Sequence, residues 1–269
     1  TAQVAQLQTQ QVGALETADL AALSTAQIAA LGSAQWLALS TVQLNALSTE
    51  QMAAIETADL VHLTTAQIEG FSSAQLQALT TAQVAALTTA QVAAIPTADF
   101  VELTTDQIGA LTTAQLHALT TRQVEALSSA QLRAIDAADL ATLSTDQIEG
   151  LSTGQISQLT TAQVAALTTQ QLRAMEDRDL VLLTTDQIAA LGTAQVAGLS
   201  TAQVERLTTA QVAAIELADL AVLGTGHMVA LGSAQIAALT TAQVAALSTT
   251  QVAAIEEGDI DALTTAQVA

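Results

Sequence analysis

Residues 79–87 read Leu-Thr-Thr-Ala-Gln-Val-Ala-Ala-Leu, and this stretch decides the fold because the whole chain repeats it. The period is eight residues, without insertion or deletion, so the 269 residues make 33 octads and five further residues. We number the octad Thr-Ala-Gln-Val-Ala-Ala-Leu-Thr from 1 to 8. Position 4 is apolar in every copy, and position 7 is Leu, Ile, Met or Phe. Position 3 is Gln in 26 of its 34 copies, Asp in seven and His in one.

The seven Asp residues at position 3 reveal a second, longer period. They recur in every fifth octad: Asp19, Asp59, Asp99, Asp139, Asp179, Asp219 and Asp259. Five octads therefore make one larger unit, and six complete units occupy residues 16–255. Because the repeat is never interrupted, we expect residues 1–269 to form a single continuous array.

Each octad predicts one short helix. Thr80 followed by Gln83 gives the capping box, in which the hydroxyl and the glutamine satisfy free N–H groups of the first turn. Leu79 and Val84 are spaced as a hydrophobic staple across the same helix start. One continuous helix is excluded, because eight residues advance about 800° and rotate the apolar pair by about 80° per octad. Strands are excluded because positions 4 and 7 have opposite parity.

Helices this short are not stable alone and must pack on one another. The sequence predicts an all-α fold, an α-solenoid of very short helices with one helix per octad. The five-octad period predicts five helices per turn, with positions 4 and 7 filling the axis. A different number of octads per turn, with the five-octad period set by partner contacts, stays open.

Composition excludes several classes of function. The chain has 25 acidic residues against five basic ones, a formal charge of −20 that disfavours binding to nucleic acid and to anionic membranes. No apolar run approaches the length of a membrane span, and there is no Cys for disulfides or thiolate chemistry. No catalytic motif is present, and the three His residues fall at different octad positions. We therefore expect no enzymatic activity and no bound cofactor.

The acidic residues of the Asp octads are the first candidate site. Stacked at one turn per five octads, they would form a ladder of carboxylates that could bind Ca²⁺ between turns. Two alternatives are open: capping of the first helical turn by the acidic side chains, and a contact with another copy. The candidate ladder residues are Glu16, Asp19, Glu56, Asp59, Asp139, Glu176, Asp179, Glu216, Asp219, Glu256 and Asp259.

A second candidate site is apolar. Octad position 5 is mostly polar or charged and predicts a solvent-facing surface, but in the Asp octads it is mostly Ala or Val. Stacked turns would make these residues an outward apolar strip suited to a lateral interface; packing under a neighbouring octad is the alternative. The strip comprises Val61, Val101 and Val181 at position 5, extended by Leu182 and Val222 at position 6.

Residues 79–87 and 239–247 resemble long octad arrays in large bacterial surface or secreted proteins, which are often labelled adhesion or heme-utilisation proteins. The resemblance implies a bacterial, extracellular or cell-surface structural protein. We expect a rod, filament or stalk subunit that self-associates into a homopolymer, because both ends lie inside the array and either continue in a longer chain or stack on another copy. The alternative is a monomeric adhesin-like binding module or spacer for a protein or glycan partner, with Ca²⁺ as a possible stabiliser.

Overall fold

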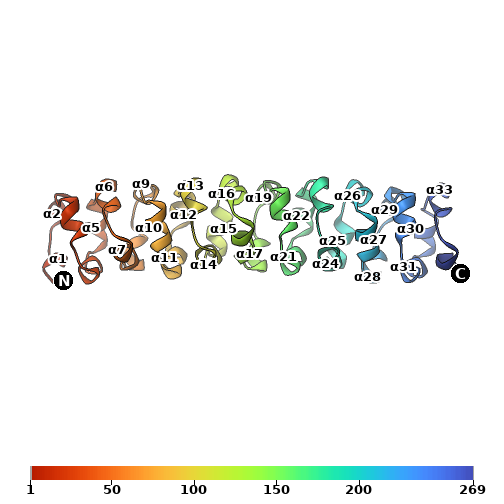
Figure 1. Ribbon diagram of the computed structural model, residues 1–269, viewed down its shortest axis with the longest axis horizontal. Coiled ribbons are helices and arrows are strands. Elements are labelled where there is room, and N and C mark those ends of the chain that lie inside the picture. The colour runs from red at the N-terminus through yellow and green to blue at the C-terminus, as the bar shows by residue number, and fades with distance from the viewer. Residues whose placement is uncertain (1, 269) are drawn as a thin grey trace. The chain divides into compact units, whose positions relative to one another are not determined.

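The computed structural model describes residues 2–268 and contains only helices and their connections over that range. It divides into two compact units, Thr1–Ile135 and Asp136–Ala269. Each octad forms one helix of four to six residues, as predicted. Within each unit the helices follow one another along the array in chain order (Figure 1).

The helices of the first unit are α1 Ala2–Ala5, α2 Thr9–Gly13, α3 Thr17–Ala21, α4 Thr25–Ile28, α5 Ser33–Ala38, α6 Thr41–Asn45, α7 Thr49–Ala53, α8 Thr57–Leu60, α9 Thr65–Glu69, α10 Ser73–Ala78, α11 Thr81–Ala86, α12 Thr89–Ala94, α13 Thr97–Phe100, α14 Thr105–Gly109, α15 Thr113–Ala118, α16 Thr121–Ala126 and α17 Ser129–Ala134.

The helices of the second unit are α18 Ala137–Leu140, α19 Thr145–Glu149, α20 Thr153–Ser157, α21 Thr161–Ala166, α22 Thr169–Ala174, α23 Asp177–Leu180, α24 Thr185–Ala189, α25 Thr193–Gly198, α26 Thr201–Arg206, α27 Thr209–Ala214, α28 Leu217–Leu220, α29 Thr225–Ala230, α30 Ser233–Ala238, α31 Thr241–Ala246, α32 Thr249–Val252, α33 Glu257–Ile260 and α34 Thr265–Val268.

The capping box starts these helices as the sequence predicts. At α11, the Thr80 hydroxyl accepts from the Gln83 backbone N–H at 3.2 Å, and the Gln83 side-chain oxygen accepts from the Thr80 N–H at 2.7 Å. The chain then leaves the helix through Leu87, whose φ and ψ of −54° and 142° turn it toward the next octad. Cap and corner together give the same local geometry in one octad after another.

Positions 4 and 7 form the core in both units. Val84 is 1% exposed and Leu87 4%, and the equivalent residues of the other interior octads are buried to the same degree. The large residues Trp36, Phe71 and Phe100 occupy these same positions and are also buried. One strip of alternating position-4 and position-7 side chains therefore supplies the hydrophobic stabilisation.

The prediction of five helices per turn is wrong. Within each unit, every closely packed pair of helices is three octads apart, such as α9 with α12 and α12 with α15. Gln83 of α11 also bonds to carbonyls at the end of α7, four octads back. A turn therefore closes within three to four octads. Each octad contributes two apolar side chains of medium size to the core. These fill a narrow core at normal protein packing density, whereas a ring of five helices would leave a central void.

Small residues allow this close stacking. Gly70, at position 6, directly follows α9. A methyl group added to it would lie 3.0 Å from the side chain of Thr41 in α6, the helix three octads earlier. One added to Gly109 at position 5 would lie 2.9 Å from the carbonyl oxygen of Ala134. Ala and Gly at these positions therefore set the spacing between turns.

Candidate functional site: glutamine bridges between turns

The repeated glutamine at position 3 makes the main polar contact between turns. The side-chain oxygen of Gln83 accepts the N–H that begins its own helix, while its Nε2 donates to the carbonyls of Met52 at 2.9 Å and Ile55 at 2.7 Å. One amide thus caps the start of one helix and the end of another, four octads earlier. Because Gln83 is only 2% exposed, all three bonds form away from water.

The same bridge recurs along each unit with the same spacing in the sequence. Gln115 donates to Val84 and Leu87, and Gln243 to Val212 and Ile215. Carbonyls at helix ends are otherwise unpaired backbone groups whose burial is costly. We define the glutamine bridge as this three-way contact of one amide with its own cap N–H and with the position-4 and position-7 carbonyls of the octad four places earlier.

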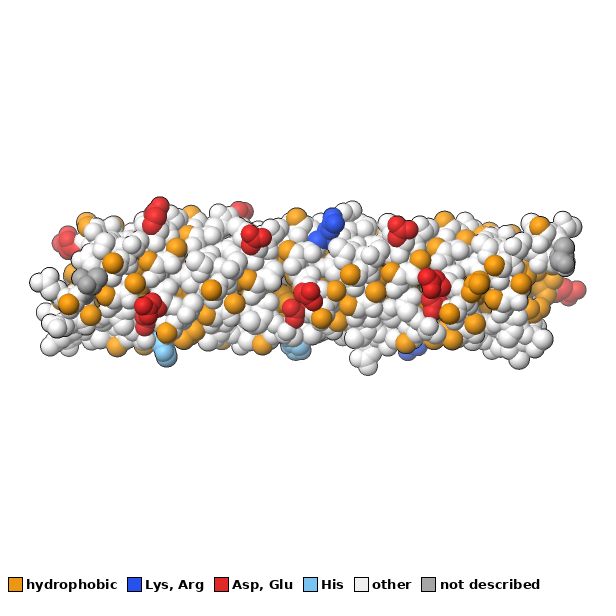
Figure 2. Space-filling model, turned by 90° about the horizontal axis from the view of Figure 1, so that it is seen from below, with side chains coloured by type: hydrophobic (Ala, Val, Ile, Leu, Met, Phe, Trp, Pro, Cys, Tyr) orange, Lys and Arg blue, Asp and Glu red, His pale blue; other side chains and the backbone are white. Residues whose placement is uncertain are grey.

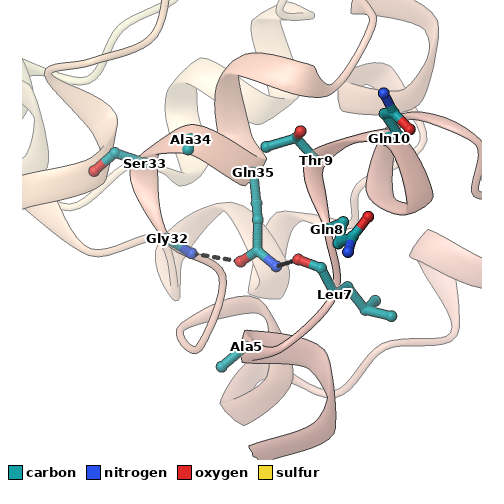
Figure 3. A pocket seen from close by; sticks show the side chains of 9 residues that line it. All are labelled: Ala5, Leu7, Gln8, Thr9, Gln10, Gly32, Ser33, Ala34 and Gln35. Carbon is teal, nitrogen blue, oxygen red and sulfur yellow. Dashed lines mark hydrogen bonds between the residues drawn. The ribbon is translucent and has the colours of Figure 1, made fainter.

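Figure 3 shows one bridge beside an open groove near the start of the chain. Gln35 accepts from the Gly32 N–H at 2.8 Å and donates to the Leu7 carbonyl at 2.8 Å. The groove has a volume of about 660 Å³ and lies between residues 5–10 and 32–35. An equivalent groove lies between residues 213–218 and 240–243. Each lies at a corner of the repeat and is lined by both polar and apolar residues of the octads around it.

Sequence reasoning predicted the capping half of this contact and missed the bridging half. A capping box accepts Glu as readily as Gln, yet Glu occurs at none of the 34 copies of position 3. This preference for Gln over Glu is the sequence signal from which the bridging contact could have been predicted. A carboxylate accepts hydrogen bonds only, whereas an amide accepts with its oxygen and donates with its nitrogen.

His227 takes the place of the glutamine in α29. Its Nδ1 lies 3.1 Å from the Gly224 nitrogen, and its Nε2 lies 2.9 Å from the Leu199 carbonyl oxygen. A neutral imidazole with its proton on Nε2 satisfies both contacts, as the amide does elsewhere. His62 and His117, in contrast, are exposed.

Three of the Asp octads make a different contact between turns. Asp59 accepts from the Ser33 hydroxyl at 2.6 Å, and Asp99 accepts from the Ser73 hydroxyl at 2.6 Å. The link joins helices three octads apart, and Asp259 repeats it with Ser233. One of the alternatives was that Asp caps the helix start as glutamine does. At these helices Asp does not make that capping contact. Its short side chain meets a hydroxyl of the neighbouring turn instead.

Within each unit, the described residues do not form the predicted carboxylate ladder. Helices α3, α8, α13, α18, α23, α28 and α33 carry the Asp residues and follow each other at intervals of five octads, whereas packed helices are three octads apart. Among residues whose side chains are described, no three His, Asp or Glu residues gather as a metal-binding group. Figure 2 shows acidic side chains as separate small groups on the visible face.

Asp179 is one of the buried acidic residues. It is 4% exposed, and among the residues whose side chains are described its Oδ1 has no hydrogen-bond partner. Burial raises the pKa of the Asp179 carboxyl above its usual range, the nearby Glu176 adds to this, and Arg178 opposes it. Arg178 itself forms an exposed ion pair with Glu176.

The residues of the predicted apolar strip fall into two groups that differ in solvent exposure. Val61, Val101 and Val181 are half-buried, so they lie partly under neighbouring chain. Leu182 and Val222 are 41% and 39% exposed. The strip was predicted from stacking at five octads per turn, and its helices are not among the closely packed pairs.

Comparison with known proteins identifies the class of repeat. The model of the ALTTAQ repeat family matches residues 12–49, 52–89, 92–129, 123–153, 132–169, 161–193, 172–209, 189–215 and 212–249. Six of these matches begin five octads apart, at residues 12, 52, 92, 132, 172 and 212, and so follow the longer period.

The chain belongs to the ALTTAQ repeat family. No curated protein matches it. No helix among the described residues has the length and apolar character that a membrane crossing requires.

Proposed function

We propose that this chain is a non-enzymatic structural element, a stalk or filament subunit of a bacterial surface or secreted protein. The observation that carries the proposal is the glutamine bridge, which recurs with one fixed spacing and, within each unit, ties one turn to the turn before it. A polar contact used in this way supports the scaffold and is not available to a substrate. The two equivalent grooves at the corners are open and lack converging charged groups.

Mechanical behaviour follows from this arrangement. Each turn contacts only its neighbours, so the array has no single set of contacts whose loss unfolds everything. Stretching should therefore detach turns one after another. The bridges connect residues close in the sequence, four octads apart, and such local contacts reform quickly when tension is released.

Single-molecule stretching of residues 1–269 between terminal handles tests the proposal. We expect a series of small, similar extensions and rapid refolding on relaxation. The control is the Gln83→Glu variant, which should lower the force of a subset of steps and leave the remainder unchanged. One abrupt extension of the whole chain, without refolding, would contradict a mechanical role for the repeat.

The alternative function, a binding module for a protein or glycan, makes a different prediction. A specific ligand would raise the unfolding temperature saturably, because it binds the folded state only. A titration with Ca²⁺ covers the calcium-dependent version. Our proposal has two finer parts. Copies of the chain self-associate, and they make lateral contact at Leu182 and Val222; the exposure of these two side chains supports the lateral contact.

A further inference from the structure

The glutamine bridges are unevenly distributed within the array. A fully bridged octad takes part in two of them, because its own glutamine donates and its carbonyls accept from the octad four places later. In the octad of residues 81–88, Gln83 donates to two earlier carbonyls and Gln115 donates to two carbonyls of the octad itself. The neighbouring octads, 73–80 and 89–96, are bridged in the same two ways. These three octads form a fully bridged block.

Each Asp octad takes part in one bridge only, and so does the octad that follows it. In residues 57–64, Asp59 replaces the donor, so this octad only accepts, from Gln91. In residues 65–72 the glutamine donates, but the octad four places later carries Asp99. Among the described residues, the carbonyls of this second octad therefore receive no glutamine amide.

We define a weak pair as an Asp octad together with the octad that follows it. The same arrangement of bridges recurs in both units, with His227 as the bridging residue in the last of these pairs. The weak pairs are residues 57–72 and 97–112 in the first unit, and residues 177–192 and 217–232 in the second.

The helices of a weak pair are also short. Helices α8 and α9 have four and five residues, whereas α10, α11 and α12 of the following block have six each. The start of α8 has no side-chain hydrogen bond at its cap. The contact of Asp59 with the Ser33 hydroxyl supplies one hydrogen bond between turns, where a glutamine bridge supplies three contacts. Local structure and contacts between turns are therefore both reduced at the same octads.

The apolar core does not distinguish weak pairs from blocks. Leu60, Leu63 and Ile68 are buried as deeply as Val84 and Leu87. Hydrophobic stabilisation is therefore similar along the array, and the difference lies in the buried hydrogen bonds. Opening residues 57–72 breaks two bridges.

Opening the same length of a block breaks twice as many bridges. In residues 81–96 two glutamines donate, and the carbonyls of both octads accept from later glutamines. Local openings of a folded protein begin where the buried contacts are fewest. The weak pairs are therefore the segments that open at the lowest cost.

We propose that the weak pairs open locally while the fully bridged blocks stay folded, so that the array yields at fixed points one five-octad period apart. The use of this device rests on the proposed structural function. A stalk or filament that yields at its weak pairs absorbs bending or stretching at these points and keeps its blocks intact. The five-octad period of the Asp residues then sets how often a yielding point occurs.

Hydrogen–deuterium exchange of the full chain, followed by mass spectrometry, tests the inference. After correction for intrinsic rates, the amides of residues 57–72 should exchange at least about tenfold faster than those of residues 81–96, because opening them breaks fewer buried hydrogen bonds. In the second unit, residues 177–192 should differ from residues 201–216 in the same direction. Equal exchange in weak pairs and blocks would overturn the inference.

Adding the missing donors should abolish the difference. Asp59→Gln/Asp99→Gln restores one donor to each octad of the pair 57–72, whose exchange should slow to the rate of residues 81–96. The matched control, Asp59→Asn/Asp99→Asn, removes the same two charges, but its side chains are too short to form the bridge. Exchange in this control should stay fast. Equal slowing in both variants would assign the effect to charge and overturn the inference.

A reverse variant tests the same inference if the added glutamines disturb folding. Gln83→Asn shortens the bridging side chain inside a block, and far-ultraviolet circular dichroism checks that the chain is folded. Exchange should rise in residues 81–88 and in residues 49–56, whose carbonyls lose the amide, and stay unchanged in residues 177–192. An unchanged rate in the first two segments would contradict the inference. The stretching experiment decides the structural function separately, because it does not depend on where exchange is fastest.

Discussion

At the residue scale, the glutamine at position 3 holds the fold together through both ends of its amide. Gln83→Glu keeps the cap and places a carboxylate oxygen against the carbonyls of Met52 and Ile55. Leaving these buried groups unpaired should lower the free energy of unfolding by about 2–3 kcal/mol. Urea denaturation measures this loss. Ala82→Glu, at an exposed site in the same first turn, is the control and should change stability little.

His227 supplies both contacts of the bridge with its two ring nitrogens, to the Gly224 nitrogen and the Leu199 carbonyl. His227→Ala removes both contacts and should lower the free energy of unfolding by about 1–3 kcal/mol, because the Leu199 carbonyl loses its partner. Urea denaturation measures the loss. His117→Ala, at an exposed residue, is the control and should change stability little.

Asp179 makes the stability of the folded chain depend on pH. Because the pKa of its carboxyl is raised in the folded state, the folded chain holds this proton more tightly than the unfolded chain does. The stabilising effect is present below the unfolded pKa of about 3.9 and is lost as pH rises through the folded value. Asp179→Asn should therefore gain stability relative to the parent as pH rises from about 4 to 7. Equal gain from Asp186→Asn, at an exposed residue, would contradict this cause.

At the scale of the element, helix propensity and stacking act against each other at the glycines. Gly154→Ala in α20 meets only open space, with the Ser152 hydroxyl 4.0 Å away, and should stabilise by about 0.5–1 kcal/mol. Gly109→Ala in α14 meets the Ala134 carbonyl oxygen at 2.9 Å and should destabilise. Thermal unfolding of both variants checks the two signs. A gain for Gly109→Ala would mean that α14 and α17 are packed less tightly than the structure shows.

The helices themselves could be predicted from the sequence because their signals are local. Thr80, Gln83 and the staple residues lie within one octad and its cap, and their bonds form there. The number of octads per turn could not be predicted in this way, because every octad carries the same packing residues and nothing distinguishes one neighbour from another. The five-octad period marks the Asp octads, three of which pair with a Ser of an earlier turn, as Asp59 does with Ser33, and it does not mark the length of a turn.

The candidate sites were predicted less well than the helices for the same reason. The acidic ladder and the apolar strip both depended on five octads per turn, so both changed when the turn proved shorter. Val61 and Val101 are half-buried by neighbours that no local pattern identifies. The bridging bonds of Gln83 also reach back four octads, and only the preference for Gln over Glu pointed to them.

At the scale of the whole molecule, an array held by neighbouring contacts should not unfold in one step. Trp36 is the single tryptophan, it is fully buried, and its fluorescence reports on α5 and the turns around it. We expect its unfolding midpoint in urea to differ from that of far-ultraviolet circular dichroism. In Trp36→Phe/Phe100→Trp the reporter moves farther into the first unit, and its midpoint should rise. Coincident transitions in both chains would contradict independent turns.

The fixed spacing of the glutamine bridge also limits how the length of the gene can change. The glutamine amide of a bridge donates to the backbone carbonyls of the octad four places earlier, and every octad has these carbonyls. Removing or adding one whole octad therefore leaves the remaining bridges with carbonyl partners of the same kind. A gene for such a chain can lose or gain eight codons by slippage during replication and still encode a folded product. Any change in length that is not a multiple of eight codons breaks the register of caps and bridges at once, so selection on length acts in whole octads.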